Sequence, residues 1–296
     1  RDFLAEPLNP EDLIAVLERL RNEPRRAIHP VAKAEIIVVL GAAGGVGTSF
    51  VACNLAHALA TEATAPTLLI DLDINAAPLA SFLDLEPERG LPPALAEVEF
   101  LDQHALPGYV TKHRSGLHLM GAPSKTTVFT KDLDANRIAT LMGVVCERYR
   151  YVVVDGSHVL DDLSVTTLGM AKTVVLVVQQ SVVQLKQAAR LMRVLHADFG
   201  IPDNRMLVVV NRHLKRSTVA LEDIRRALAR ERLVVVPNQY KTVLSSIDGG
   251  VPMLEFDPSS PVTKAIVDLQ REICGAPPIE RAGLLRRALP IFSGTN

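Results

Sequence analysis

Residues Val38–Phe50 read Val-Val-Leu-Gly-Ala-Ala-Gly-Gly-Val-Gly-Thr-Ser-Phe. The apolar run Glu35–Leu40, of buried-strand type, leads into the glycines, and Val51–Ala60 follows with the apolar spacing of a helix. Strand, glycine-rich loop and helix form the setting of a phosphate-binding loop. The glycines let backbone N–H groups turn towards an anion, and the helix N-terminus carries a partial positive charge. The predicted cofactor-binding residues here are Gly44, Gly45, Val46, Gly47, Thr48, Ser49 and Phe50.

This loop departs from the common P-loop pattern G-x-x-x-x-G-K-[ST] at two positions. Ala42 replaces the first glycine and Thr48 replaces the lysine, whereas Ser49 keeps the hydroxyl that binds magnesium. A lysine places a point charge on the β- and γ-phosphates, which threonine cannot do. Because losing one transition-state contact typically costs ~10²–10³ in rate, the loop predicts weak ATP hydrolysis at most.

Two of the apolar strands that follow end in acidic residues. The predicted strand Thr67–Asp73 ends in Asp71 and Asp73, and the predicted strand Tyr151–Asp155 ends in Asp155. Alternation along a strand would place Asp71 and Asp73 on one side, where both could face one metal ion. Nucleotides and metals bind at the carboxyl ends of parallel strands, so this pattern favours a metal site over an ordinary polar turn.

Strands and helices continue to alternate through the rest of the chain. Further strands are predicted at Thr173–Val178, Met206–Arg212 and Val234–Tyr240, and helices at Ile138–Tyr149 and Gln187–Phe199. This order predicts an α/β fold, a mainly parallel, doubly wound sheet with helices on both faces. Residues 86–136 are less regular because proline and glycine interrupt them.

The loop Ala43–Ser49 resembles that of the deviant Walker A ATPases, the MinD/ParA superfamily, whose pattern is K-G-G-x-G-K-[ST]. Both family lysines are replaced, by Ala43 and Thr48. Threonine at the second lysine position is similar to the CpaE/TadZ branch, the pilus-assembly ATPase homologues. The resemblance spans about residues 35–275, and it also includes the stretches Leu79–Leu85, Gly116–Pro123, Val234–Tyr240 and Ser246–Leu254.

The resemblance implies a P-loop protein that binds ATP or ADP with Mg²⁺. In it, Ser49, Asp71 and Asp155 would hold the metal, Asp71 often through water, and Asp73 would be the catalytic residue that orients the attacking water. The residues expected at or near the adenine base are Asn211, Pro237, Asn238 and Gln239.

The biological role follows from the same resemblance. A CpaE/TadZ-like protein would be a cytoplasmic homodimer that localises and assembles the type IV (Tad/Flp) pilus secretion machinery. Its expected partners are the pilus secretion ATPase and membrane platform components, and its expected place is the inner membrane or the cell pole.

The two ends of the chain leave alternatives open. Residues 1–21 resemble the last strand and helix of a receiver-like domain, with a linker at 22–34, and an ordinary N-terminal helix is equally compatible. In the tail, residues 276–296, one face of the stretch 281–292 is apolar and the rest is rich in arginine. That stretch is either an amphipathic membrane-binding segment or a docking strip for protein.

Bulk composition excludes few functions. The 296 residues carry a formal net charge of −1, so no global field attracts nucleic acid. The three cysteines are too far apart for a zinc or disulfide pattern, which fits a reducing cytosol. No chemistry is predicted for the isolated histidines His104, His113 and His118.

Two other functions compete with the pilus role. One is a competent ParA/MinD-type ATPase in DNA segregation or flagellar placement, and the other is a dimer scaffold that binds no nucleotide. Arginines and lysines gather between Arg212 and Arg232, but acidic residues interrupt them. A solvated face is therefore the better interpretation, and no nucleic-acid partner is expected.

Overall fold

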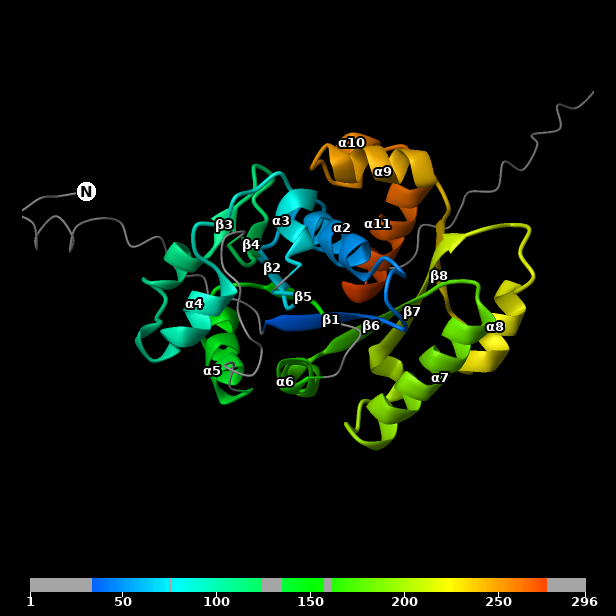
Figure 1. Ribbon diagram of the computed structural model, residues 1–296, viewed down its shortest axis with the longest axis horizontal. Helices are drawn as coiled ribbons and strands as arrows, with labels where there is room; N and C mark the ends of the chain where they lie inside the picture. The colour runs from blue at the N-terminus through cyan, green and yellow to red at the C-terminus, as the bar shows by residue number, and fades with distance from the viewer. Residues whose placement is uncertain (1–33, 75, 124–134, 157–160, 276–296) are drawn as a thin grey trace, which may run out of the picture. The chain divides into compact units, whose positions relative to one another are not determined.

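The computed structural model describes residues 34–74, 76–123, 135–156 and 161–275. Within them, eight strands form one sheet in the order β3-β4-β2-β5-β1-β6-β7-β8 (Figure 1). All neighbouring strands are parallel except β3 and β4, which are antiparallel. The strands are β1 Glu35–Gly41, β2 Thr67–Asp71, β3 Thr111–Lys112, β4 His118–Met120, β5 Tyr151–Asp155, β6 Thr173–Val178, β7 Met206–His213 and β8 Val234–Pro237.

The central strands are buried along their whole length because helices cover both faces of the sheet, and their polar residues lie at the strand ends. Every residue of β1, β2 and β5 is buried. Side chains alternate between two cores: Ile36 and Val38 pack into one, and Ile37 and Val39 pack into the other. Continuous hydrophobic runs of this kind are typical of parallel strands between two helical layers.

One helical layer contains α2, α3, α9, α10 and α11, and the opposite layer contains α4 to α8 (Figure 1). The first layer consists of α2 Thr48–Thr61, α3 Pro78–Phe82, α9 Tyr240–Asp248, α10 Met253–Phe256 and α11 Pro261–Ile273. The second consists of α4 Leu91–Ala96, α5 Ala135–Cys146, α6 Asp162–Met170, α7 Val182–Ala197 and α8 Leu221–Leu228. Short 3₁₀ helices lie at Val98–Phe100, Leu106–Tyr109 and Asp203–Arg205. The predicted doubly wound α/β fold is confirmed.

Some predictions differ from the structure or lie outside it. The irregular stretch 86–123 contains α4, two 3₁₀ helices and the antiparallel pair β3–β4, and of these only β4 lies within a stretch that the family resemblance included, Gly116–Pro123. The predictions for residues 1–33 and for the tail 276–296 fall outside the described residues. None of the described helices combines the length and apolar character needed to cross a bilayer.

Candidate functional site: a glycine loop, a base-sized pocket and buried acids

The glycine loop connects the end of β1 to the start of α2. Gly45 and Gly47 have left-handed backbones, with φ of 74° and 96°. A Cβ on Gly47 would lie 2.3 Å from the side-chain nitrogen of Asn211, so only glycine fits there. The first turn of α2 has neither an acidic residue nor a side-chain cap, and Val51 makes the first intrahelical bond, to the Gly47 carbonyl. The preceding N–H groups are therefore free to bind an anion.

Two side chains from neighbouring strands hold this loop in place. Asn211 Nδ2 donates to the carbonyl oxygen of Val46 at 2.8 Å, and Gln179 Nε2 donates to the same oxygen at 3.3 Å. Asn211 Oδ1 accepts from the backbone N–H of Arg212 at 2.9 Å. A trans peptide points its C=O and N–H in opposite directions, so the Gly47 N–H points away from Asn211. The sequence predicted an adenine contact for Asn211 and missed this contact to the loop.

A pocket of about 110 Å³ adjoins the loop. It brings together Gly47 and Phe50 from the start of α2 with Asn211 and the segment Pro237–Gln239, all predicted as cofactor-binding. The rest of its lining consists of Arg212, Val236, Tyr240, Val243, Leu244 and Ile247. Val236 and Tyr240 belong to the stretch Val234–Tyr240 of the family resemblance, whereas the other four were not predicted as binding residues. The last four residues of the lining lie at i, i+3, i+4 and i+7 of α9, and this spacing was the signal for one helix face. Two apolar walls with amide groups at one side suit a planar heterocycle.

The two buried acids, Asp71 and Asp155, are register partners on β2 and β5. Asp71 is fully buried, and both of its carboxylate oxygens accept backbone hydrogen bonds, from the N–H of Asp73 at 3.0 Å and of Leu79 at 3.3 Å. Burial and the charge of Asp155 raise the pKa of Asp71. Through these two bonds Asp71 fixes the turn after β2. Each of its oxygens keeps a further lone pair that could accept from a metal-bound water.

Asp155 has a different environment. It is 3% exposed, and its Oδ1 has no hydrogen-bond partner among the described residues. Burial raises its pKa to about 7, with a smaller contribution from the charge of Asp73, and a hydrogen bond with Ser49 opposes the shift. An unpartnered buried oxygen beside a hydroxyl is a donor set that fits Mg²⁺, which prefers oxygen ligands. Ser49 and Asp155 thus fit the predicted metal role.

Asp73 lies beyond the end of its strand. The predicted strand extended to Asp73, but β2 ends at Asp71, so strand alternation does not place the two carboxylates on one side. Asp73 is exposed on a turn, where its Oδ1 accepts from the N–H of Ala76 at 3.2 Å. Its charge makes a small contribution to the raised pKa of Asp155. An exposed carboxylate at Asp73, near Asp155, is compatible with orienting a water molecule.

Thr48 occupies the lysine position at the base of the loop. Its Oγ1 lies only 2.4 Å from where a Cβ on Gly41 would be, so the side chain packs against the last residue of β1. The loop from Gly41 to Phe50 contains no lysine or arginine. Within the loop itself, a phosphate would find backbone N–H groups and the Thr48 and Ser49 hydroxyls as donors.

Known proteins are similar to this chain in sequence and in fold. The AAA_31 family, described as an AAA domain, matches residues 34–197. The chain is 25% identical over 248 residues to septum site-determining protein MinD of Thermotoga maritima, covering 81% of this chain and 88% of that protein.

Two solved structures have a similar fold. The ParA family ATPase of Chlorobium tepidum has a TM-score of 0.74 and 24% identity, covering 81% of this chain and 99% of that one. MinD of Pyrococcus horikoshii, complexed with Mg-ADP, has a TM-score of 0.68 and 17% identity, covering 81% and 96%. Since the family match extends over more than half of the residues, this chain belongs to the AAA_31 family.

Proposed function

We propose that this chain binds ATP with Mg²⁺ and uses the bound nucleotide to stabilise a homodimer, with weak or absent hydrolysis. The main support for this proposal is that the glycine loop and the pocket share residues and lie side by side. Gly47 and Phe50 belong to the phosphate loop and the first turn of α2, and they also line the pocket whose far wall is Pro237–Gln239. A nucleotide needs a phosphate site and a base site side by side.

In this proposal the phosphates bind to backbone N–H groups of Gly45, Gly47, Thr48 and Ser49. Ser49 and Asp155 hold Mg²⁺, which neutralises phosphate charge when it is bound. Asp71 acts indirectly by fixing the turn that carries Asp73. The base lies in the pocket beside Asn211 and Pro237–Gln239.

The missing lysines limit catalysis more than binding. Backbone donors and Mg²⁺ hold the ground-state phosphates, whereas a lysine stabilises the additional charge that develops in the transition state. With Ala43 and Thr48 in the two lysine positions, hydrolysis loses that contribution. Asp73 still provides a carboxylate that can orient water, so slow turnover is the expected activity.

An exposed apolar surface near the loop supports the homodimer. Val182 and Val183, at the start of α7, are 59% and 67% exposed, and Leu214 is 50% exposed. The side chain of Gln180 bonds to the N–H of Leu214 at 2.7 Å, which brings the two segments together. The neighbouring Gln179 contacts the glycine loop, so this surface is connected to the nucleotide site. A second copy of the chain that covers this surface would lie close to the glycine loop, so the dimer contact would depend on the state of the loop.

We further propose a CpaE/TadZ-like role in localising and assembling type IV pilus machinery. Its support is the resemblance of the loop, with Thr48 in the lysine position, and of the four stretches between residues 79 and 254. The expected partners are the pilus secretion ATPase and membrane platform components, with the tail 281–292 as a candidate membrane contact. Co-purification of that secretion ATPase with the tagged chain would test the role. Capture of DNA instead, weakening steeply with salt, would favour a ParA-type role.

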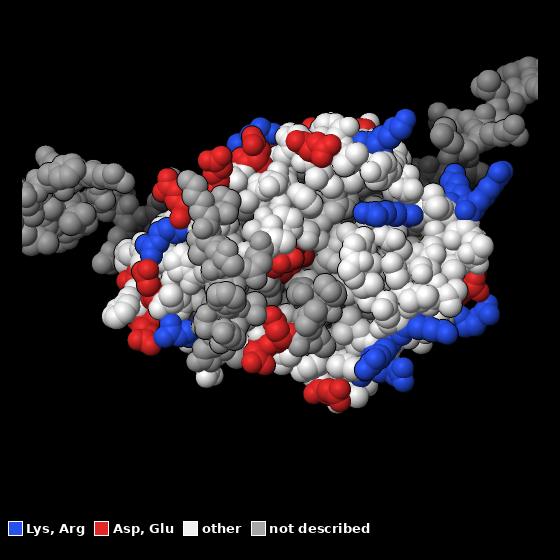
Figure 2. Space-filling view, viewed as in Figure 1, with Lys and Arg blue, Asp and Glu red and all other residues white. Residues whose placement is uncertain are grey.

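The charged residues near α8 argue against DNA binding. Arg225 pairs with Glu222 at 2.6 Å, and Arg230 pairs with Asp203 at 2.8 Å. On the face drawn in Figure 2, basic side chains over α7 and α8 have acidic ones among them. Pairing of this kind neutralises the field that a DNA backbone would require.

Substitution of Gly47 by alanine tests nucleotide binding. The added Cβ would collide with the Asn211 amide and would have to adopt φ near 96°, so it disturbs the loop and pocket together. We expect Mg-ATP to raise the melting temperature of the wild type and to have little effect on Gly47→Ala. Gly143→Ala is the matched control, because an added Cβ on this exposed glycine of α5 meets open space. An equal nucleotide-induced shift in Gly47→Ala and the wild type would refute the proposed site.

A further inference from the structure

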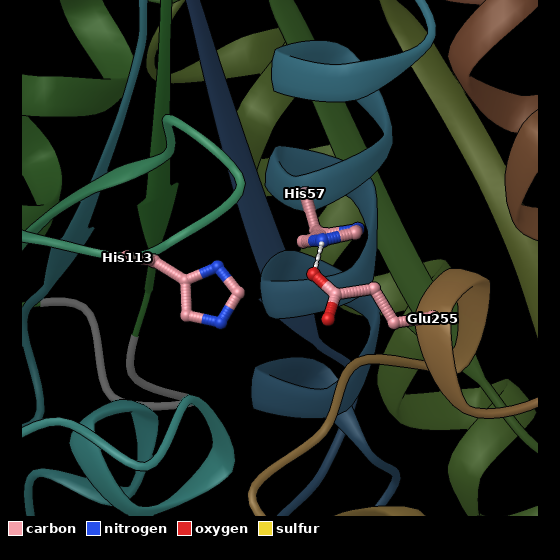
Figure 3. A group of neighbouring side chains, drawn as sticks. All are labelled: His57, His113 and Glu255. Carbon is pink, nitrogen blue, oxygen red and sulfur yellow. Dashed lines mark hydrogen bonds and ion pairs between the residues drawn. The ribbon is translucent and has the colours of Figure 1, made fainter.

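Three side chains converge at a second place, away from the nucleotide loop (Figure 3). His57 comes from α2, His113 from the turn between β3 and β4, and Glu255 from α10. His57 lies nine residues after Thr48, or about 14 Å along the helix, so the cluster is separate from the phosphate loop.

The ligand atoms of this cluster are close together. One ring nitrogen from each histidine and one carboxylate oxygen of Glu255 all lie within 4.8 Å of one another. His57 Nε2 and Glu255 Oε1 are 2.9 Å apart, and the centroids of the two imidazole rings are 5.8 Å apart. Both histidines are buried, at 1% and 6% exposure.

A simple histidine–carboxylate pair leaves part of this cluster unexplained. A second imidazole, His113, packs edge-on against that of His57, at an interplanar angle of 72°. Two buried imidazoles that share one carboxylate form a donor set that a cation could join.

Neighbouring groups orient the donors from outside. Arg114 donates to Glu255 Oε2 through Nε at 2.9 Å and Nη2 at 2.6 Å, which leaves Oε1 facing His57. The Nδ1 of His113 accepts from the backbone N–H of Ser115 at 3.2 Å and lies 2.7 Å from the hydroxyl of the same residue. Asn54 Oδ1 accepts from the N–H of Met253 at 2.7 Å and so fixes α10 against α2. Hydrogen bonds to a ligating carboxylate, such as those from Arg114 to Glu255, help to orient the ligands of metal sites in proteins.

We propose that His57, His113 and Glu255 bind a divalent transition metal ion, with Zn²⁺ as the best match. Two imidazoles and one carboxylate are a known three-ligand set for zinc, and water completes the tetrahedron. With bonds of about 2.0–2.2 Å, tetrahedral ligand atoms lie roughly 3.3 Å apart. On binding, the distance between His57 Nε2 and Glu255 Oε1 would therefore increase slightly from 2.9 Å, and the longer distances within the cluster would decrease. Mg²⁺ prefers oxygen ligands and is not expected here. The bound ion would join α2 to α10 and to the β3–β4 turn.

The test is a titration of the metal-stripped 296-residue chain with ZnCl₂ in excess Mg²⁺ and without nucleotide, followed by calorimetry. We expect one equivalent to bind, and His113→Gln and Glu255→Gln each to weaken binding at least about tenfold. The matched control is His104→Gln, because His104 is exposed and outside the cluster. Circular dichroism of each variant checks that the fold is intact.

CoCl₂ in place of zinc reports the ligand types. The proposal predicts a visible spectrum of four-coordinate cobalt with nitrogen and oxygen ligands, which is lost in Glu255→Gln. A thiolate charge-transfer band would place the ion on a cysteine and overturn the proposal. Undetectable binding would also overturn it, as would an affinity that both cluster variants leave unchanged.

Discussion

Asn211, at the end of β7, donates its side-chain amide to the carbonyl oxygen of Val46 in the glycine loop, 2.8 Å away. This bond links the strand that borders the base pocket to the loop that would hold the phosphates. Its nitrogen also lies where a Cβ on residue 47 would be, so the glycine and the asparagine depend on each other. The conformation of the loop is therefore set by a residue 165 positions away in sequence.

Removal of this bond should weaken nucleotide binding. In Asn211→Ala the Val46 carbonyl keeps only the longer contact to Gln179, and the loop loses its tie to β7. A lost buried hydrogen bond costs about 1–3 kcal/mol, so we expect about a tenfold or greater rise in the Kd for Mg-ATP, measured by calorimetry. Asn204→Ala, on an exposed 3₁₀ turn, is the control. An unchanged Kd would show that the bond does not shape the site.

Restoring the missing charge should increase hydrolysis. Thr48→Lys introduces a cation for the β- and γ-phosphates, and the double variant Ala43→Lys/Thr48→Lys also restores the second family lysine. We expect phosphate release by the double variant to rise by ~10²-fold or more over the wild type, since one transition-state donor typically has that effect. Thr48→Ser keeps a hydroxyl without a charge and should stay at the wild-type rate. If both lysine variants hydrolyse ATP no faster than Thr48→Ser, another part of the site limits catalysis.

The buried Asp155 should make stability depend on pH. Burial raises the pKa of this carboxyl from 3.8 to about 7. Between these values the folded chain retains a proton that the unfolded chain has lost, so the free energy of unfolding falls as pH rises from about 4 to 7 and levels off above that. The difference corresponds to roughly 4 kcal/mol at about 1.36 kcal/mol per pKa unit.

Urea unfolding between pH 4.5 and 7.5, with EDTA and without nucleotide, measures this effect. Asp155→Asn cannot ionise, so its free energy of unfolding should fall much less over that range than that of the wild type. Asp198→Asn, at an exposed position after α7, should follow the wild type. Identical pH profiles for the wild type and Asp155→Asn would contradict the raised pKa.

The exposed valines of α7 should be needed for the dimer. Val183→Asp places a charge on a side chain that is 67% exposed in the single chain, so the fold should tolerate it. Within an apolar dimer contact the same charge would be buried without a partner, at a cost of several kcal/mol. We expect this variant to stay monomeric in Mg-ATP by light scattering. Lys186→Asp, on an exposed position one turn further along the helix, is the charge control, and equal dimerisation of all three proteins would place the interface elsewhere.

The fold was predictable because its signals are local. The apolar runs of β1, β5 and β6 and the glycines around Gly47 lie within short stretches, and they specify buried parallel strands and a phosphate loop. The end of β2 was predicted two residues too late. Its true end depends on Asp71, whose side chain binds the N–H groups of Asp73 and Leu79, and strand periodicity does not report this contact.

The site was predictable only in part, because some of its contacts join distant segments. The loop residues and Pro237–Gln239 were identified by motif, whereas the second role of Asn211 required the packing of β7 against the loop. The cluster of His57, His113 and Glu255 has no motif at all. Its members come from three separate elements, and only the folded chain brings them together.

The central claim is that the loop and pocket bind nucleotide and that binding drives dimerisation. The most direct measurement is a titration of the purified chain with ATP and Mg²⁺ in which calorimetry gives the affinity and light scattering gives the mass. We predict micromolar binding, about −8 kcal/mol, together with a shift from monomer to dimer. No detectable binding with an unchanged mass would contradict the account and leave a scaffold that kept the fold without its nucleotide chemistry.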